Sequence, residues 1–349
     1  MSRATLAAAL GLLACSVQAV EMDYFYENYE EAEKIARQQG KPLYLHFTTT
    51  WCGWCRRIEN DVYKQEEGKK ALSPFVCATL DCTVPRGQQP SGSARFNRDL
   101  MKKYGGGGYP FLLMVTPEGD LLHTIGGYKP LAAFKEDLAK AQENLKKLKD
   151  FKAYAAKADK TSYEYNARAL TFYSDVGMWP KAAVAARAIQ KLDPEFKKGQ
   201  AALVNYALLR STVPQPGEED KFKALEEAVI RHDGENAHGY LEKVLLARAS
   251  AAYRKASRAR NKEGFARAAD ALNLLLKKAK KVTNEANVRG FLGFVQMQAG
   301  NREAAIAAME KALELEPTGR RSDMLKRYLK TLKEQRDKDA QSAKEKTGR

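Results

Sequence analysis

The sequence predicts an α/β domain followed by an all-α array of helices, and three observations lead to this prediction. The chain has 349 residues, and at about 150 residues per domain this length suggests two domains. Short apolar runs typical of buried strands occur between residues 43 and 125, and none follows residue 150. The remainder is rich in Ala, Leu and charged residues that recur with a helical period.

In the first part of the chain, predicted helices alternate with strands and a hairpin closes the sheet. Pro110 opens one strand, and residues 117–120 provide the turn of the hairpin. The elements expected in order are helix 28–40, strand 43–47, helix 52–62, strand 75–80, helix 94–104, strand 111–115, strand 121–125 and helix 131–148. This order is typical of a mixed α/β sandwich.

Beyond residue 150, the spacing of small and apolar residues predicts paired helices. The clearest pair spans residues 286–319, a weaker copy spans 163–196, and a third pair covers 238–281. The clearest pair carries Leu292, Gly293, Gly300, Ala305, Met309, Ala312 and Pro317. These positions resemble the tetratricopeptide repeat, in which small residues lie where paired helices touch and Pro ends the second helix. The Pro- and Gly-containing stretch 211–220 predicts a loop between pairs.

The first nineteen residues predict a cleaved export signal. Arg3 supplies a positive start, residues 4–17 are apolar, and small residues precede the expected cut after Ala19. The apolar run is too short to span a bilayer. The expected organisation is a signal peptide over 1–19, domains over 20–149 and 150–333, and a charged tail over 334–349. We expect the tail to fray because it lacks an apolar stripe.

Export favours a location in a bacterial periplasm or cell envelope and excludes intracellular nucleic acid as a partner. An alternative is a lipid anchor, because residues 12–15 resemble a weak bacterial lipobox that ends in Cys15. Under that interpretation the mature protein is attached to a membrane through Cys15. The simpler interpretation is an ordinary cysteine in a signal that is removed.

The formal net charge of +16 is concentrated in the helical part of the chain. Residues 1–150 hold 20 basic and 18 acidic side chains, whereas residues 151–349 hold 39 and 25. The densest basic cluster lies between Arg254 and Lys281. Such a cluster is either a solvated face or a docking surface for an acidic protein or an anionic envelope surface.

The most informative motif is Trp51-Cys52-Gly53-Trp54-Cys55. Two thiols three residues apart at the start of a helix can form a bridge, and the helix N-terminus lowers the pKa of the first thiol. Cys52 is then the attacking thiolate, and Cys55 resolves the mixed disulfide. The alternatives are a static disulfide and half of a zinc site. Zinc normally takes four ligands, and neither the other cysteines nor the 4 histidines show such spacing, so we expect no metal and no cofactor.

Residues 27–148 resemble thioredoxin beyond this motif. Residues 104–115 match the approach to the cis-proline strand of thioredoxin, and Gly126-Gly127 matches the turn before its last helix. The resemblance implies a thiol–disulfide oxidoreductase that acts on protein disulfides and is reset by a separate redox partner. It also implies a cis Tyr109–Pro110 peptide beside the thiols. The substrate-binding residues that it implies are Trp51, Gly53, Trp54, Tyr109 and Pro110.

Two positions depart from thioredoxin. Trp54 stands where thioredoxin has Pro, and the residues between the cysteines tune the reduction potential. The direction of electron flow therefore stays open, although the motif region is closest to reducing thioredoxins and favours a reductase or isomerase over a primary oxidase. His46 stands where thioredoxin has a buried Asp that helps to move the proton of the second thiol. His46 is either a proton relay for Cys55 or a core residue without a role in turnover.

Cys77 and Cys82 are too far apart to form a bridge if the strand between them is extended. Five residues of strand span about 16 Å, whereas a disulfide needs Cα atoms within about 7 Å. We expect Cys77 to pack in the core. Cys82 falls at the end of the strand, on the edge where the active site lies in this fold, and is either a buried thiol or a third redox thiol.

A competing interpretation of the whole chain is an envelope adaptor, in which the helical repeats bind a partner and the first domain is not catalytic. A domain retired from catalysis has no need of both Cys52 and Cys55, so we favour the oxidoreductase. Its expected partners are protein thiol and disulfide substrates, a redox partner that resets the pair, and an acidic protein or anionic surface bound by the helical part.

Overall fold

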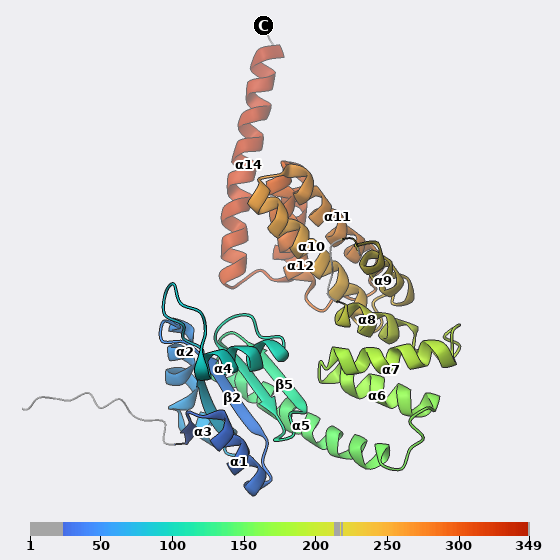
Figure 1. Cartoon of the computed structure of the whole chain (residues 1–349). Helices are drawn as coiled ribbons and strands as arrows, with labels where there is room; N and C mark the ends of the chain where they lie inside the picture. The colour runs from blue at the N-terminus through green and yellow to red at the C-terminus, as the bar shows by residue number, and fades with distance from the viewer. Residues whose placement is uncertain (1–23, 213–216, 218, 348–349) are drawn as a thin grey trace, which may run out of the picture. The chain divides into compact units, whose positions relative to one another are not determined.

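The computed structural model describes residues 24–212, 217 and 219–347. The predicted export signal over 1–19, with Cys15, lies outside these residues. Contacts within the chain define two compact units, Met1–Asp150 and Phe151–Arg349, and each is described by itself (Figure 1). The boundary falls inside helix α5 (Leu131–Ala155), which continues past its predicted end at residue 148.

The first unit is built on a five-stranded mixed sheet with the order β1-β3-β2-β4-β5. Its strands are β1 (Phe25–Tyr26), β2 (Leu43–Thr48), β3 (Val76–Asp81), β4 (Phe111–Val115) and β5 (Leu121–Gly126). Strands β1, β3 and β2 run parallel, whereas β4 is antiparallel to β2 and β5 is antiparallel to β4. This sheet confirms the predicted α/β class, and β1 is a short edge strand that the sequence pattern does not predict.

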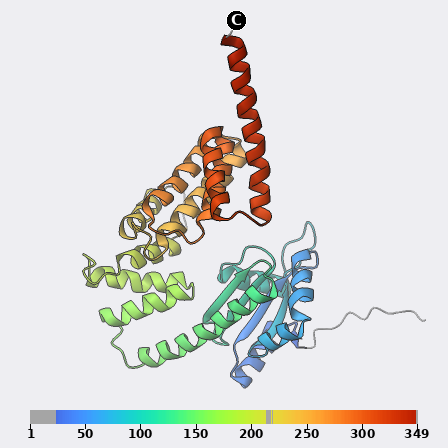
Figure 2. The same ribbon diagram turned by 180° about the vertical axis from the view of Figure 1, so that it is seen from behind.

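Helices pack against this sheet and set the position of its cysteine motif. They are α1 (Tyr29–Gln39), α2 (Gly53–Ile58), the π-helical segment η1 (Glu59–Tyr63), α3 (Glu66–Leu72), α4 (Gly92–Lys103) and α5. Tyr44 of β2 contacts Tyr63 of η1 and Phe134 of α5, so η1 and α5 pack on the same face of the sheet. Figure 2 shows α5 crossing that face. The predicted helix over 52–62 is therefore present as α2 and η1, and α3 is an addition.

The ends of helix α1 are set by a capping side chain at its start and by a glycine at its end. The side chain of Asn28 caps its start by accepting hydrogen bonds from the backbone N–H groups of Glu30 and Glu31. Gly40 ends it in the left-handed region at φ 63°, which glycine adopts without a steric penalty. The predicted stop at Gly40 is confirmed.

The second unit is helical throughout the residues that the structure describes. Its helices are α6 (Tyr163–Asp175), α7 (Trp179–Leu192), α8 (Ala201–Ser211), α9 (Glu219–His232), α10 (Tyr240–Ala259), α11 (Lys262–Lys278), α12 (Glu285–Ala299), α13 (Arg302–Leu315) and α14 (Arg320–Thr347). Each helix packs against the next one along the chain. This confirms the predicted helical part, with α6–α7, α10–α11 and α12–α13 as the three predicted pairs. Their identification as tetratricopeptide repeats stays a prediction.

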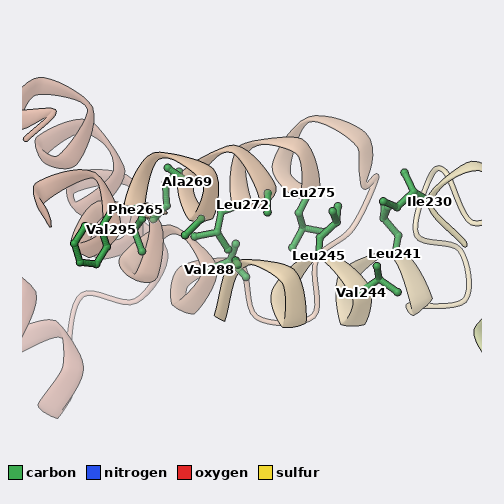
Figure 3. Packing of buried hydrophobic residues seen from close by; sticks show 14 of the residues in the cluster. Ile230, Leu241, Val244, Leu245, Phe265, Ala269, Leu272, Leu275, Val288 and Val295 are labelled. Atoms are coloured by element: carbon green, nitrogen blue, oxygen red, sulfur yellow. The ribbon is translucent and has the colours of Figure 1, made fainter. Parts of the chain in front are cut away.

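Side chains from successive helices share one hydrophobic core (Figure 3). Figure 3 shows Leu245 of α10 beside Leu275 of α11, and Val288 of α12 beside Leu272. Small residues allow the helices to approach closely, because a Cβ added at Gly293 of α12 would lie only 2.5 Å from Cγ of Met309 on α13. The predicted role of small residues at helix contacts is thus seen at Gly293.

Part of the predicted loop 211–220, residues 213–216 and 218, lies outside the described residues. The helices on its two sides pack together, because Leu209 of α8 and Val229 of α9 are buried in one hydrophobic cluster. One expectation for the helical part is corrected: the charged tail does not fray after residue 333, since α14 continues to Thr347. Two ion pairs of 2.6 Å, Lys333 with Glu310 and Arg302 with Asp339, tie α14 to α13.

No helix in residues 24–212 or 219–347 is both long and apolar enough to cross a membrane. In that same part of the chain, no group of 3 or more His, Cys, Asp or Glu side chains is arranged to hold a metal ion.

Candidate active site

Cys52 and Cys55 form a disulfide at the start of α2, with their Cα atoms 5.2 Å apart. Strand β2 ends at Thr48, and the backbone N–H of Cys52 donates to the carbonyl of Thr49 at 3.0 Å, which turns the chain into the helix. Cys52 is the N-cap residue of α2, and its Sγ accepts a hydrogen bond from the backbone N–H of Cys55 at 3.1 Å. The pair therefore bridges, as its spacing predicts.

The surroundings of the disulfide favour Cys52 as the sulfur that meets a partner. Cys52 is 4% exposed and Cys55 is 1% exposed. Gly53 begins α2, and a Cβ added to it would meet nothing within 4 Å, so the approach to Cys52 is open there. The first turn of α2 contains no acidic residue, and its last turn carries Arg56 and Arg57. After reduction, the N–H groups and dipole of the helix N-terminus stabilise a thiolate at Cys52.

Two loops contact the motif, one before β4 and one after β5. The first contains Tyr109. The Tyr109–Pro110 peptide is cis, as the resemblance to thioredoxin predicts. The ring of Tyr109 lies 5.8 Å from that of Trp51 at an interplanar angle of 83°. The carbonyl of Pro110 accepts a hydrogen bond from the N–H of Gly127 at 2.9 Å, which joins this loop to the one after β5.

The second loop brings Tyr128 against Trp54, with ring centroids 5.6 Å apart. The guanidinium of Arg57 lies 5.5 Å from the centroid of Trp54 and 5.1 Å from that of Tyr128. Asp61 Oδ2 accepts hydrogen bonds from Arg57 Nε at 3.1 Å and from the Tyr128 hydroxyl at 2.7 Å. The sequence argument missed Tyr128 and Asp61, although the four-residue spacing of Arg57 and Asp61 was a local signal for an ion pair.

His46 lies at the centre of the sheet, on β2, and is fully buried. Its Cα partners are Thr79 on β3 and Leu112 on β4. Among the described residues, neither ring nitrogen of His46 has a hydrogen-bond partner, and the ring packs edge-on against Tyr63 at 5.4 Å. Burial lowers the pKa of His46 to about 3, so the side chain is neutral at physiological pH. Its predicted role as a proton relay stays a prediction.

Glu59 is a candidate residue that the sequence argument missed. Its backbone N–H donates to the carbonyl of Cys55, which places it one helical turn after the second thiol. The side chain is half-buried, and this burial raises the pKa of the carboxyl above its ordinary value against the opposing charges of Lys64 and Arg56. A carboxyl with a raised pKa, one helical turn after Cys55, holds a proton more readily than an exposed glutamate and is therefore a candidate for proton transfer.

Comparisons with known proteins bear on the first unit. Residues 29–142 match a family model described as a thioredoxin-like domain. The first unit is a thioredoxin-like domain. A solved structure of a DsbH oxidoreductase is similar, with 25% identity, 41% of this chain and 95% of that chain covered, and a TM-score of 0.30. The reduced C-terminal domain of Neisseria meningitidis DsbD shares 19% identity, with 32% and 91% covered and a TM-score of 0.27.

Two curated relatives are proteins named spermatogenesis-associated protein 20. The human protein is 27% identical over 176 residues, which are 48% of this chain and 21% of that protein. The mouse protein is 27% identical over 89 residues, which are 25% of this chain and 11% of that protein. The chain thus spans about a fifth or less of the length of these relatives.

The two remaining cysteines of the thioredoxin-like domain are free and buried. Burial raises the pKa of both thiols, that of Cys82 to about 11. The Cys82 thiol donates a hydrogen bond to the carbonyl of Leu80 at 3.7 Å. Tyr109 is near enough to Cys82 for the two groups to shift one another's pKa. A buried thiol that resists ionisation is a poor nucleophile, which favours the structural interpretation of Cys82 over a third redox thiol.

Proposed function

We propose that the chain is a thiol–disulfide oxidoreductase that reduces or isomerises disulfides in other proteins. One observation carries this proposal, the Cys52–Cys55 pair at the N-terminus of α2 in a thioredoxin-like domain. The pair has the spacing and the helix position that thiol–disulfide exchange needs, and Cys52 is the more exposed of the two cysteines. The cis Tyr109–Pro110 peptide and the exposed rings around the pair supply a surface for a substrate.

The reduced pair transfers two electrons in two exchange steps. The Cys52 thiolate attacks one sulfur of a substrate disulfide, so Cys52 bonds to that sulfur while the other substrate sulfur leaves as a thiolate. Cys55 then loses its proton and attacks Sγ of Cys52, which forms the Cys52–Cys55 bond and releases the second substrate sulfur. The substrate is reduced and the pair is oxidised. A redox partner carrying a dithiol must return two electrons before the next turnover.

The proton of Cys55 needs an acceptor in the second step. Protonation of His46 is unfavourable because its pKa is lowered to about 3. Glu59 follows Cys55 by one helical turn, and its raised pKa brings the carboxyl closer to the pKa of a thiol than that of an exposed glutamate. We therefore assign proton transfer to Glu59, with His46 as the alternative.

The substrate surface that we propose consists of Trp51, Gly53, Trp54, Tyr109 and Pro110. An extended substrate segment would pair with the backbone of Tyr109, next to Cys52. The contact between Trp51 and Tyr109 supports this arrangement, because it ties the motif to the loop that carries the cis peptide.

We further propose that the basic helical part docks the protein onto an acidic protein or an anionic envelope surface, and not onto nucleic acid. Arg254, Lys255 and Arg258 of α10 line a shallow hollow. None of the three takes part in an ion pair with another described residue, so their charge is free to act on a partner. Export to a bacterial periplasm or envelope is the location that the sequence of residues 1–19 supports.

Vesicles containing phosphatidylglycerol provide a test of this docking. The full-length chain should bind these vesicles at low salt and dissociate from them as the salt concentration rises. It should not bind vesicles of phosphatidylcholine alone. Replacement of Arg254, Lys255 and Arg258 by Ser should weaken the binding. Binding to a partner that stays constant as salt rises contradicts docking through charge.

The test of the catalytic proposal is the reduction of insulin disulfides by dithiothreitol with the full-length chain as catalyst. Wild type should accelerate the reaction, whereas Cys52→Ala should not, because it lacks the attacking sulfur. Cys77→Ala is the matched control, since it removes a buried thiol outside the motif and should keep the activity. Equal rates for wild type and Cys52→Ala contradict the proposal and favour an envelope adaptor whose helices bind a partner.

A further inference from the structure

Two exposed indole rings flank the first cysteine of the motif. Trp51 is 66% exposed and Trp54 is 53% exposed, although most large apolar side chains of this domain are buried. Each indole packs against a tyrosine from another loop, Trp51 against Tyr109 and Trp54 against Tyr128. Exposed aromatic surface beside a reactive sulfur marks a binding site, because burying it against a partner is favourable.

The Trp54–Tyr128 pair is held in place by charged neighbours. Arg57 lies over both rings, and Asp61 binds Arg57 at 3.1 Å and the hydroxyl of Tyr128 at 2.7 Å. These contacts order the two rings before any ligand arrives. A surface that is already ordered loses less conformational freedom when it binds, so more of the contact energy appears as affinity.

The balance of charge at this pair decides what it can bind. Arg57 is neutralised by Asp61, and Arg56, the cation before it, donates to the carbonyl of Thr50 at 2.9 Å. The pair therefore presents aromatic rings and no unpaired charge of Arg57 to a ligand. Such a surface favours an apolar side chain, because burial against the two rings is favourable, over a carboxylate, which would lose hydration without gaining the charge of Arg57.

The position of Tyr128 relates the pair to the substrate segment proposed above. Tyr128 follows Gly127, whose N–H donates to the carbonyl of Pro110 at 2.9 Å. If a substrate lies along Tyr109–Pro110 with a sulfur at Cys52, a residue beside its cysteine would be near the Trp54–Tyr128 pair.

We propose that Trp54 and Tyr128, positioned by Arg57 and Asp61, form a subsite for an aromatic or large aliphatic side chain beside the disulfide of the substrate. This inference rests on the proposed function and names its substrate class. That class is polypeptide disulfides with an apolar neighbour, which unfolded and partly folded chains expose.

The test uses the full-length chain and symmetric disulfides of short peptides in which Phe, Ala or Asp stands beside the Cys. We expect kcat/KM to be about 10-fold higher for the Phe peptide than for the Ala peptide. The change should come from a lower KM for the Phe peptide, with kcat similar for the two. Tyr128→Ala should reduce this ratio to about 2-fold. Tyr128→Phe keeps the ring and should retain most of the ratio.

Two controls separate selection from a general loss of activity. Each rate is divided by the rate of the same variant with hydroxyethyl disulfide, which has no side chain to select. Phe96→Ala removes another exposed ring, 46% exposed on α4, and should leave the ratio unchanged.

Three claims can be tested separately: the existence of the subsite, its preference for apolar side chains, and the proposed function. Equal kcat/KM for the Phe and Ala peptides, or a ratio that Tyr128→Ala leaves unchanged, overturns the subsite while the proposed function stands. Fastest reduction of the Asp peptide overturns the preference for apolar side chains. Failure of wild type to reduce hydroxyethyl disulfide overturns the proposed function itself.

Discussion

The two units of the chain differ in where they depart from regular structure. The thioredoxin-like domain gathers its irregular features around its cysteine pair and central strands. These features are the π-helical segment Glu59–Tyr63, the cis Tyr109–Pro110 peptide and a buried His46 with no hydrogen-bond partner among the described residues. The helical part consists of successive packed helices, and its irregular backbone lies in connections and at a helix end, where Phe196, Asn236 and Arg260 have positive φ. It also differs in charge, with 39 basic and 25 acidic side chains over residues 151–349.

This difference indicates which unit should respond to a substitution with a change in thiol–disulfide exchange and which with a change in stability or docking. Irregular backbone and buried polar groups cost stability, and they cluster at functional sites because the chemistry needs them. Substitutions at these irregular features and at the cysteine pair of the thioredoxin-like domain should therefore change the exchange reaction. Substitutions in the helical part should change stability or docking while the exchange reaction continues.

Replacement of the resolving sulfur has the largest expected effect. Cys55→Ser leaves Cys52 able to attack but unable to release its product, so insulin turnover falls to the background rate and a mixed disulfide accumulates. Mass spectrometry of the trapped chain should place the adduct on Cys52. The buried thiols Cys77 and Cys82 serve as internal controls. An adduct on Cys82 in place of Cys52 contradicts the assignment of the attacking sulfur.

Loss of the proton acceptor should have the next largest effect. Glu59→Gln should slow the release of substrate from the Cys52 mixed disulfide by about 100-fold near neutral pH. In wild type this rate should fall as pH drops below the raised pKa of Glu59, because a protonated carboxyl cannot accept the proton. In Glu59→Gln the rate of substrate release should not show this decrease at low pH.

Stopped-flow measurement of the second exchange step across pH checks the assignment to Glu59, with His46→Gln as the matched variant. If His46→Gln removes the pH dependence and Glu59→Gln keeps it, the proton passes to His46 and the assignment to Glu59 is wrong.

The buried His46 should make the stability of the domain depend on pH. Its pKa is lowered from 6.5 to about 3, so between these values the unfolded chain binds a proton that the folded chain does not. Its contribution to stability is complete above the unfolded pKa and is lost as pH falls, by about 2 kcal/mol at about pH 5. Urea unfolding of wild type and His46→Phe at several pH values measures this, and identical slopes would refute it.

A smaller effect is expected from crowding the helical part. A Cβ at Gly293 would lie 2.5 Å from Cγ of Met309 and 3.1 Å from the carbonyl oxygen of Ala305. Gly293→Ala should lower the free energy of unfolding by about 1 kcal/mol, because the clash exceeds the gain in helix propensity. Insulin reduction should be unchanged.

Gly234→Ala is the control for Gly293→Ala, since its nearest contact would be an ordinary 3.5 Å to the carbonyl oxygen of Arg231. Circular dichroism during urea unfolding gives the stabilities of both variants. A drop in the insulin rate of folded Gly293→Ala would show that the helical part contributes to the chemistry.

Elements with a complete local pattern could be predicted from the sequence. The strand Phe111–Val115 is a run of apolar residues with Pro110 before it and a turn after it, and its bounds are confirmed. Strand β1 has only 2 residues and exists through its pairing with β3, which no local pattern reveals. Helix α3 has 7 residues, too few to show a hydrophobic period. Helix α14 contacts α13 through buried Leu325 and Leu332 and through the ion pair of Arg302 with Asp339, and these partners are distant in sequence.

The same contrast holds for the candidate site. The spacing of Cys52 and Cys55 is local, and it predicts their bridge. The contact of Tyr128 with Asp61 joins residues 67 positions apart and depends on the register of the hairpin β4–β5. The depth at which His46 lies, and with it the direction of its pKa, follows from packing on both faces of the sheet and could not be read from the sequence.

The central claim is that Cys52 and Cys55 exchange reversibly with protein disulfides. Its most direct test is the reduction potential of the pair in the full-length chain, from equilibration with glutathione and dithiothreitol buffers. We predict a single two-electron transition between about −270 mV, the value of thioredoxin, and about −180 mV, that of protein disulfide isomerase. A pair that stays oxidised below about −300 mV, as structural disulfides do, would contradict the claim.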